Sequence, residues 1–326
     1  MRLIPRWISA ENLALPPSDM IYQSPPSRPL PFPRSSAAGL RIGAVQYLNT
    51  RPLVHGLAAA GLAVSYDLPS RLADRLAGGT LDVALIPSVE VFRGGYQVIS
   101  DACIGCRGPV MSVKLFFRTA PGDVRTLAVD EGSRTSAALA RVLLAKRHGV
   151  RPLMETLPIG SGLADTRADA VLVIGDRALD SRGSADRHAG SFQLMWDLGD
   201  EWCRWTGLPF VFAVWAARDG VEVASLEPLL TRARDSGLAN LAAIAAAEAG
   251  SHGLTVPQCL GYLRDNLHYH LGGSEAQSLS LFQHHAADLQ LAPAENRLRL
   301  PWNPPTAATM APGMRPSGIA LPGKAS

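Results

Sequence analysis

Two polar residues lie beside apolar runs, where they could bind an anion or help a hydroxyl group to leave. Asn49 follows the run 41–45, and its amide can both donate and accept hydrogen bonds. Ser112 lies within the run 110–117, and a hydroxyl buried there needs a partner, which a ligand in a cleft would supply. Structural roles are the alternatives: Asn49 as the N-cap of a helix, and Ser112 bonded to neighbouring backbone.

A further polar group lies in the segment 132–136, whose hydroxyls belong to Ser133, Thr135 and Ser136. These residues begin a helix predicted over 134–146. Unpaired backbone amides and the dipole at the start of a helix attract anions, so we expect this segment to contact a carboxylate. The alternative is that Ser133 only caps the helix.

The sequence offers no evident side-chain base next to these donors. Glu90 and Asp176 are the acids closest to the expected cleft, but each falls in the first turn of a predicted helix, where a carboxylate is also favoured for structural reasons. The histidines are scattered along the chain. Neither Ser88 nor Ser112 has a histidine and an acid near it in sequence, so the pattern does not indicate a serine hydrolase.

The elements that must position these residues alternate between short apolar runs and helical patterns, as in parallel strands joined by crossover helices. Strands are expected at 41–45, 81–86, 126–129, 168–174 and 208–216, and helices at 51–59, 71–77, 89–92, 134–146, 226–249, 256–271 and 276–289. Ser88 is well placed as the N-cap of the helix at 89–92.

Ligands of open α/β sheets lie beyond the carboxyl ends of the strands. We therefore expect one cleft, lined by the loops 46–50, 87–90, 130–136 and 175–176. Within these loops Tyr47, Ser88 and Asp176 are expected to contact the substrate, together with the hydroxyls of the helix start.

Two long apolar runs, 110–117 and 208–216, could carry the chain from one lobe to the other and back. We therefore expect a first lobe of residues 40–117 and 212–292 and a second lobe of 118–211. Flexible tails are expected at 1–39 and 293–326, because eight and seven of the 25 prolines fall in these two segments.

The composition favours a globular chain over a disordered or fibrous one. Of the 326 residues, 47% are hydrophobic and 18% are charged, and the net charge of +3 is spread without a basic block, so nucleic acid is not an expected partner. No apolar run reaches the roughly 18 residues that a membrane span needs. Four cysteines without regular spacing do not predict a disulfide framework, and Cys103 and Cys106 lack a second pair for a metal. We expect a cytoplasmic protein, while the oligomeric state stays open.

Several strings of this sequence together resemble the chorismate dehydratase family of menaquinone biosynthesis. They are the segments 45–53, 108–113, 133–136, 174–176 and 202–215, which occur in the order the family has them. The resemblance implies two hinged lobes similar to periplasmic binding proteins of the second type, closing on a cleft. It also implies conversion of chorismate to 3-[(1-carboxyvinyl)oxy]benzoate with loss of water, in the futalosine route.

The resemblance implies roles for Asn49 and Ser112 as catalytic residues of the cleft and ligand contacts from 133–136. Arg107, just before Gly108, departs from the family pattern, so no role is carried over to it. Because the product is aromatic, the reaction needs no redox cofactor and no metal. We expect the enolpyruvyl carboxylate of the substrate to accept the C3 proton, with Glu90 or Asp176 as the alternative acceptors.

Two other functions fit the same fold. One is a solute-binding protein that performs no reaction. The expected lack of an export signal counts against this alternative. The other is the later 1,4-dihydroxy-6-naphthoate synthase of the pathway, against which we weigh the strings around Asn49 and Ser112.

Overall fold

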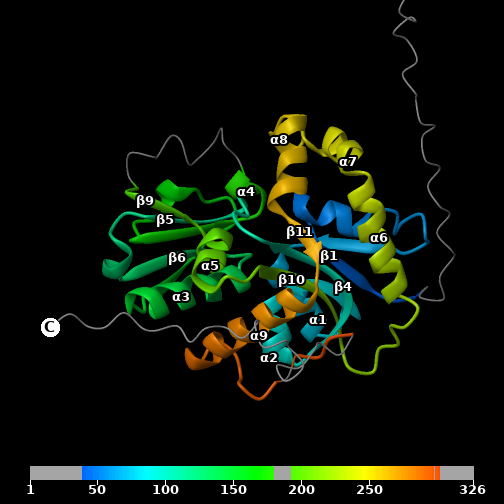
Figure 1. The fold of residues 1–326 in the computed structure, drawn as a ribbon, viewed down its shortest axis with the longest axis horizontal. Helices are drawn as coiled ribbons and strands as arrows, with labels where there is room; N and C mark the ends of the chain where they lie inside the picture. Colours follow the sequence, from blue (N-terminus) through cyan, green and yellow to red (C-terminus); the bar gives the residue numbers. More distant parts are fainter. Residues whose placement is uncertain (1–38, 180–191, 297, 302–326) are drawn as a thin grey trace, which may run out of the picture. The chain divides into compact units, whose positions relative to one another are not determined.

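The computed structural model describes residues 39–179, 192–296 and 298–301, which form two β-sheets with helices packed against them (Figure 1). The expected tail 1–39 lies outside the described residues except for Gly39. Within the described part, no helix is both long and apolar enough to cross a membrane.

The sheet of lobe 1 has six strands in the order β11-β4-β10-β3-β1-β2. Their bounds are β1 Ile42–Val45, β2 Val64–Asp67, β3 Val83–Pro87, β4 Gln97–Cys106, β10 Phe210–Ala217 and β11 His268–His270. β1 is parallel to both β2 and β3, whereas β10 runs antiparallel to β3 and β4. The expectation of purely parallel strands is therefore wrong for this sheet.

The sheet of lobe 2 has five strands in the order β7-β6-β8-β5-β9. Their bounds are β5 Val113–Phe117, β6 Thr126–Asp130, β7 Leu153–Leu157, β8 Ala170–Ile174 and β9 Leu194–Asp197. Here β6 is parallel to β7 and β8, and β5 is antiparallel to β8 and β9. Each sheet thus contains an antiparallel strand that begins directly after a crossing of the chain.

The two crossings lie at 107–112 and 207–209, between β4 and β5 and before β10. The lobe boundaries expected at residues 118 and 212 were late by about five and two residues, because β5 begins at Val113 and β10 at Phe210. Residues 113–117 pair with β8 and β9 of lobe 2, and residues 210 and 211 pair with β4 of lobe 1.

The helices cover the sheets, and several of them begin or end at a residue that favours a helix terminus. Their bounds are α1 Pro69–Ala77, α2 Ser88–Gly94, α3 Thr135–His148, α4 Asp176–Leu179, α5 Leu198–Thr206, α6 Glu227–Ala239, α7 Leu241–Glu248, α8 Val256–Gly261 and α9 Gly273–Asp288; the 3-10 helices are η1 Leu48–Val54, η2 Pro121–Asp123 and η3 Leu163–Asp165, and a π-helix, η5, covers Tyr262–Asn266. α1 begins with Pro69, where a missing amide costs no helical hydrogen bond. α3 ends at Gly149, whose φ of +72° is easiest for glycine.

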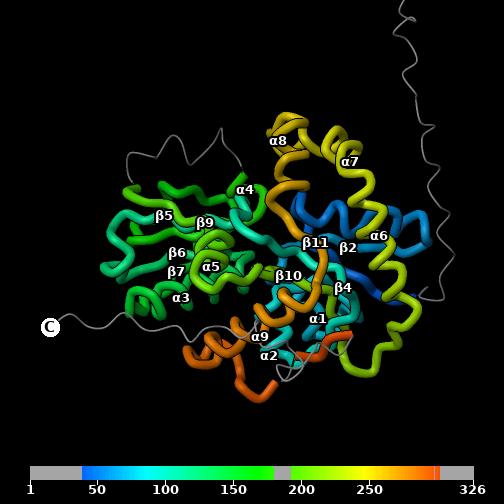
Figure 2. The backbone as a smooth tube through the Cα atoms, in the orientation of Figure 1, coloured from blue at the N-terminus to red at the C-terminus, as the bar shows by residue number. Residues whose placement is uncertain are grey.

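An aromatic cluster joins the two lobes on the side of α9. Trp202 of α5 packs edge-to-face against Phe210 of β10 and Phe282 of α9, with ring centroids 5.2 and 6.0 Å apart. The Trp202 indole also donates to Ser278 at 3.0 Å. α9 extends from β10 to α3 of the other lobe, as the orange tube in Figure 2 shows. Burial of such large rings stabilises the pair of lobes, by about 2 kcal/mol for each ring.

The start of the expected C-terminal tail packs on lobe 1. Asn296 donates to the Phe92 carbonyl at 2.6 Å, and Arg299 forms a β-bridge with Gln97 at the start of β4. Leu298 packs against the core. The described residues 293–296 and 298–301 therefore belong to lobe 1, so the tail boundary expected at residue 293 was too early.

Candidate active site

A pocket lies between the two sheets and is lined by residues from both lobes. It contains about 500 Å³ of atom-free space, including its open mouth. Its polar lining consists of Tyr47, Asn49, Ser112, Ser133, Arg134, Thr135 and Ser136. Apolar side chains, among them Ile104, Val110 and Phe212, complete the walls. A few polar groups converging in an apolar cavity are typical of a small-molecule site.

Asn49 lies in η1 with only 9% of its surface exposed. The helix begins earlier than expected: Tyr47 is at the N-cap position, and no side chain caps the helix. The capping alternative for Asn49 is therefore wrong. The Thr50 hydroxyl donates to the Asn49 Oδ1 over a long 3.4 Å, so this contact constrains the amide weakly.

Ser112 lies in the first crossing, 1% exposed and directly after a strained residue. Met111 has a φ of +61°, in the left-handed region that side chains other than glycine rarely adopt. The Asp197 carboxylate accepts hydrogen bonds from the amides of Val110 at 3.0 Å and Met111 at 2.7 Å, which fixes this conformation. The Ser112 hydroxyl itself has only a 3.4 Å contact with the Val110 carbonyl, the backbone bond we weighed as its structural role.

Asn49 and Ser112 also share a neighbour, Tyr262 of the π-helix η5. Burial raises the pKa of the Tyr262 hydroxyl, and its interactions with the Ser112 and Asn49 side chains lower it. These contacts do not reach the geometry of good hydrogen bonds, and the hydroxyl is buried without another partner among the described residues. The Asn49 amide and the Ser112 hydroxyl, which we expected to act together, thus line the same pocket, and both lie beside the Tyr262 hydroxyl.

The start of α3 contributes hydroxyls with unused hydrogen-bonding capacity. The Ser133 hydroxyl is buried and has no partner within the described ranges. The Gly132 amide donates to the Asp130 carboxylate at 3.0 Å, and the Ser133 amide to the Asp130 carbonyl at 2.8 Å, which shapes the turn before the helix. Ser133 does not cap the helix, because no side-chain cap is formed. The turn therefore presents donors to the pocket, as a carboxylate site requires.

Tyr47 reaches from lobe 1 into lobe 2. A Cβ atom on Gly175 would lie 2.7 Å from the Tyr47 ring, and one on Gly132 would lie 3.1 Å from its hydroxyl. Burial raises the pKa of Tyr47, and the charges of Asp130 and Asp176 raise it further. The hydroxyl therefore stays protonated near neutral pH. It is buried without a partner in the part of the chain that the structure describes, so it can donate to a ligand.

Ser88 of lobe 1 and Thr135 of lobe 2 face each other across the lobes, with their hydroxyl oxygens 3.4 Å apart. Ser88 donates to the Val211 carbonyl at 2.8 Å, and the Thr135 hydroxyl accepts from the Val89 amide at 3.2 Å. Ser88 is the first residue of α2, with Pro87 at the N-cap position, so its expected capping role is wrong. Thr135 lines the pocket, whereas Ser88 lies just outside it.

The two acids considered as bases are both engaged outside the pocket lining. Glu90 pairs with Arg93 at 2.6 Å and with Arg134 at 3.4 Å. Asp176 accepts from the Leu48 amide at 3.0 Å, and burial raises its pKa. Among the residues that the structure describes, no carboxylate lines the pocket.

Arg134 is a lining residue that sequence reasoning did not single out, although it lies within the segment 133–136 from which the resemblance implied ligand contacts. Its guanidinium reaches Asp74 of α1 at 2.7 Å as well as Glu90 of α2. Within the described ranges it is the one charged side chain on the pocket wall, so the site does not consist of neutral donors alone. No local pattern around Arg134 indicated that its side chain contacts the opposite lobe.

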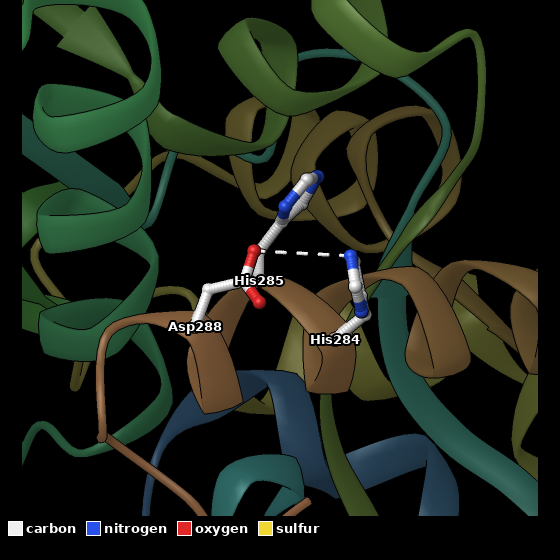
Figure 3. A group of neighbouring side chains, drawn as sticks. All are labelled: His284, His285 and Asp288. Carbon is white, nitrogen blue, oxygen red and sulfur yellow. Dashed lines mark ion pairs between the residues drawn. The ribbon is translucent and has the colours of Figure 1, made fainter.

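A group of side chains able to bind a metal lies elsewhere, at the end of α9 (Figure 3). Atoms of His284, His285 and Asp288 that could act as ligands lie within 4.8 Å of one another. Asp288 is paired with Lys146 at 2.7 Å, and His285 stacks on Trp205. None of these residues lines the pocket.

Cys103 and Cys106, whose spacing resembled a metal motif, are buried free thiols on β4. Burial raises the pKa of the Cys103 thiol. Cys106 lies against Cys203, and this contact together with burial raises its pKa.

A protein family described as menaquinone biosynthesis matches residues 40–288. The chain belongs to this family. The resemblance seen in the sequence is thereby confirmed at the level of the family, over nearly all of the two lobes.

A curated protein to which the chain is similar is the chorismate dehydratase of Thermus thermophilus. It is 32% identical over 266 residues, which cover 77% of this chain and 96% of the relative. The match therefore extends over almost the whole length of that enzyme.

Solved structures support the fold. The periplasmic aliphatic sulphonate-binding protein of Escherichia coli has a TM-score of 0.52 at 16% identity, covering 88% of this chain and 97% of its own. A protein of Archaeoglobus fulgidus has a TM-score of 0.55 at 14% identity, covering 77% and 98%. The prediction of a two-lobe α/β fold like that of periplasmic binding proteins is thus confirmed.

Proposed function

We propose that this protein is a chorismate dehydratase, a hydro-lyase that converts chorismate to 3-[(1-carboxyvinyl)oxy]benzoate and water on the futalosine route to menaquinone. The observation that carries the proposal is the 32% identity to the Thermus thermophilus chorismate dehydratase along 96% of that enzyme. The pocket supports it independently, since it offers hydroxyl, amide and helix-start donors to a dianion.

The elimination removes the proton from C3 and the hydroxyl group from C4 of the ring. The electron pair of the C3–H bond becomes the new double bond between C3 and C4, and the C4–O bond breaks. The ring becomes aromatic, so the reaction is strongly downhill and exchanges no electrons with another molecule. Proton and hydroxide together leave as water.

The enolpyruvyl carboxylate of chorismate itself accepts the C3 proton in this proposal. The support is the position of the alternative bases: Glu90 is held by two arginines, Asp176 is bonded to the Leu48 amide, and neither lines the pocket. A carboxylate tethered to the reacting ring also has a high effective concentration.

Asn49 orients that carboxylate or assists the departing hydroxide, and Ser112 holds the ring. Both act by positioning and electrostatics in a pocket from which water is excluded, not by covalent attack. The ring carboxylate binds at the start of α3, where the hydroxyls of Ser133 and Tyr47 are buried without partners among the described residues. A fixed side-chain conformation also prevents the competing rearrangement to prephenate.

The decisive experiment is incubation of the purified protein with chorismate, followed by mass spectrometry and absorbance. We expect an aromatic product lighter than chorismate by one water. Binding of chorismate without any product would instead favour a solute-binding protein of this fold. Formation of prephenate or release of pyruvate alone would contradict the proposed elimination.

A further inference from the structure

The mouth of the cleft carries ion pairs between the lobes, next to the proposed carboxylate site. Arg134 of lobe 2 contacts Asp74 at 2.7 Å and Glu90 at 3.4 Å, both in lobe 1. Arg71 of lobe 1 contacts Glu131 of lobe 2 at 3.7 Å. Helices α1 and α2 are thereby tied to the turn that leads from β6 into α3.

Two of these residues, Arg71 and Asp74, come from one face of α1. Arg71 and Asp74 are three residues apart, so both side chains point toward the same neighbour. With Glu131 and Arg134 they line a second, more polar cavity that lies between the lobes. A polar cavity of this kind admits water, and hydrated ion pairs can form and break as lobes move.

Arg134 differs from the other residues in this group because it also lines the substrate pocket. It is the residue before Thr135, the first residue of α3, and it directly follows Ser133, whose hydroxyl has no partner within the described residues. Its side chain is 27% exposed, whereas the Glu90 side chain that it meets is 12% exposed. Ion pairs that hold the Arg134 guanidinium against lobe 1 therefore also hold the start of α3 in place.

Arg134 can form its ion pairs only when the two lobes are in contact. Glu90 keeps Arg93 as a second partner within lobe 1, at 2.6 Å, so it stays balanced without Arg134. Asp74 has a 65% exposed side chain and pairs with Arg134 across the lobes. Arg134, by contrast, draws both of its pairing carboxylates from lobe 1.

We propose that Arg134 is a positioning residue that couples lobe closure to assembly of the carboxylate site at the start of α3. Its pairs with Asp74 and Glu90 form on closure and hold the segment 132–136 against the bound anion. The catalytic consequences rest on the proposed function, but the effect on closure does not. Exposed ion pairs contribute little singly, so we expect the Asp74 pair to change the ratio of closed to open protein about two- to fivefold.

The test uses Asp74, which lies outside the pocket. Asp74→Arg places two cations together, Asp74→Asn removes the pair, and Asp74→Glu keeps a carboxylate. Asp265→Asn is the matched control, because this exposed acid pairs with Arg264 inside one lobe. Spin labels on exposed positions of the two lobes, Ala59→Cys and Arg151→Cys in a Cys203→Ser background, report the interlobe distance.

The distances are measured by pulsed electron resonance without ligand and during titration with chorismate, at low and high salt. We expect Asp74→Arg, and less strongly Asp74→Asn, to reduce the closed fraction or to raise the chorismate concentration needed for closure. Asp74→Glu and Asp265→Asn should match the parent. High salt should open the parent more than Asp74→Asn, which keeps only the Arg134–Glu90 and Arg71–Glu131 pairs between the lobes. Identical distance distributions and titration midpoints in Asp74→Arg and the parent would overturn the proposal.

Steady-state kinetics separate positioning from a merely structural effect. Closure coupled to binding predicts that Asp74→Asn raises KM about fivefold, changes kcat less than about twofold, and is rescued in Asp74→Glu. A fall in kcat with unchanged KM, together with a lower melting temperature, would overturn it. If the parent does not turn chorismate over, the proposed function fails, while the ligand-free distances and their salt dependence still decide the role of Arg134.

Discussion

Asn49 is the residue for which the structure makes the sharpest catalytic expectation. Its amide lines the pocket but contributes little to holding η1, because its contact with Thr50 is long. We expect Asn49→Ala to bind chorismate nearly as well as the parent while kcat falls about 100- to 1000-fold, the usual cost of losing one oriented donor. Stopped-flow binding and steady-state assays measure the two quantities.

Asn240→Ala is a suitable control for that variant, since Asn240 follows α6 and does not line the pocket. It should keep full activity. An Asn49→Ala protein with unchanged kcat would remove the amide from the mechanism.

Substrate assistance makes a prediction about the ligand instead of the protein. An analogue whose enolpyruvyl carboxylate is replaced by a neutral amide should bind at the start of α3 through its ring carboxylate but should not lose water, because no other base lines the pocket among the described residues. Mass spectrometry after long incubation checks this. Normal turnover of the analogue would return attention to Asp176 and Glu90.

At the residue scale, the sequence predicted most of the polar side chains that line the pocket, whereas Ser88 and Asp176, which were also expected there, lie outside the lining. Asn49, Ser112 and the hydroxyls of the α3 start line one pocket as expected, since strand ends place them locally. Arg134 and Tyr262 were not singled out because their contacts depend on the other lobe or on a distant segment. For Tyr262, a π-helix interrupts what the pattern predicted as one continuous helix.

Gly175, in the turn between β8 and α4, allows Tyr47 of lobe 1 to pack closely against lobe 2. Gly175 has a φ of +64°, and a Cβ atom there would lie 2.7 Å from the Tyr47 ring. Gly207 has a similar φ of +71° but nothing within 4 Å of a Cβ atom. Gly207→Ala therefore measures the backbone strain alone, and we expect it to cost about 1 kcal/mol of stability.

Gly175→Ala should cost about 1 to 3 kcal/mol more than Gly207→Ala, because it also displaces Tyr47. It should reduce activity as well, whereas Gly207→Ala should not. Urea unfolding and chorismate assays compare the two. Equal stability losses would mean that Tyr47 does not pack tightly across the lobes.

At the element scale, buried strands with clear apolar runs were predicted correctly, and exposed or mixed ones were not. β7 has four exposed residues out of five, and β2 has none that is fully buried, so neither shows an apolar run. The direction of β5 and β10 could not be read from their residues, because antiparallel pairing follows from where the chain crosses between lobes. The helix expected over 226–249 is divided at Asn240 into α6 and α7.

The buried acid Glu275 makes the stability of the folded protein depend on pH. Burial alone would raise the pKa of Glu275, but the His268 ring at 3.3 Å, together with hydrogen bonds from the Glu275 backbone, Arg107 and Ser274, lowers it to about 2. A carboxyl with a depressed pKa in the folded state stabilises the protein above its unfolded pKa, and this contribution is lost as the pH falls through the folded value. We therefore expect the parent to lose stability between about pH 4.5 and pH 2.

Glu275→Gln should be less stable than the parent at about pH 7, and its stability should depend less on pH in that acidic range. Thermal unfolding across the pH series measures both. Parallel pH profiles in the two proteins would exclude Glu275 as a source of the acid sensitivity.

At the scale of the whole molecule, the sequence predicted the two lobes and their double crossing. Alternation of apolar runs and helical patterns indicated an α/β class. The two long apolar runs, 110–117 and 208–216, indicated where the chain crosses between the lobes. The exact boundaries depend on hydrogen-bond pairing between distant strands, which no local pattern reports. The same holds for residues 298–301, which pack on lobe 1 although their proline-rich surroundings suggested a free tail.

The position of β10 has a consequence for how the chain is made. This strand fills the interior of the lobe 1 sheet between β3 and β4, yet it leaves the ribosome only after all of lobe 2. Lobe 2 is continuous in sequence from β5 to α5, so it can fold while synthesis proceeds. The amino-terminal half of lobe 1 meanwhile waits with the backbone edges of β3 and β4 unpaired, so we expect the nascent chain to be most prone to aggregation during that interval.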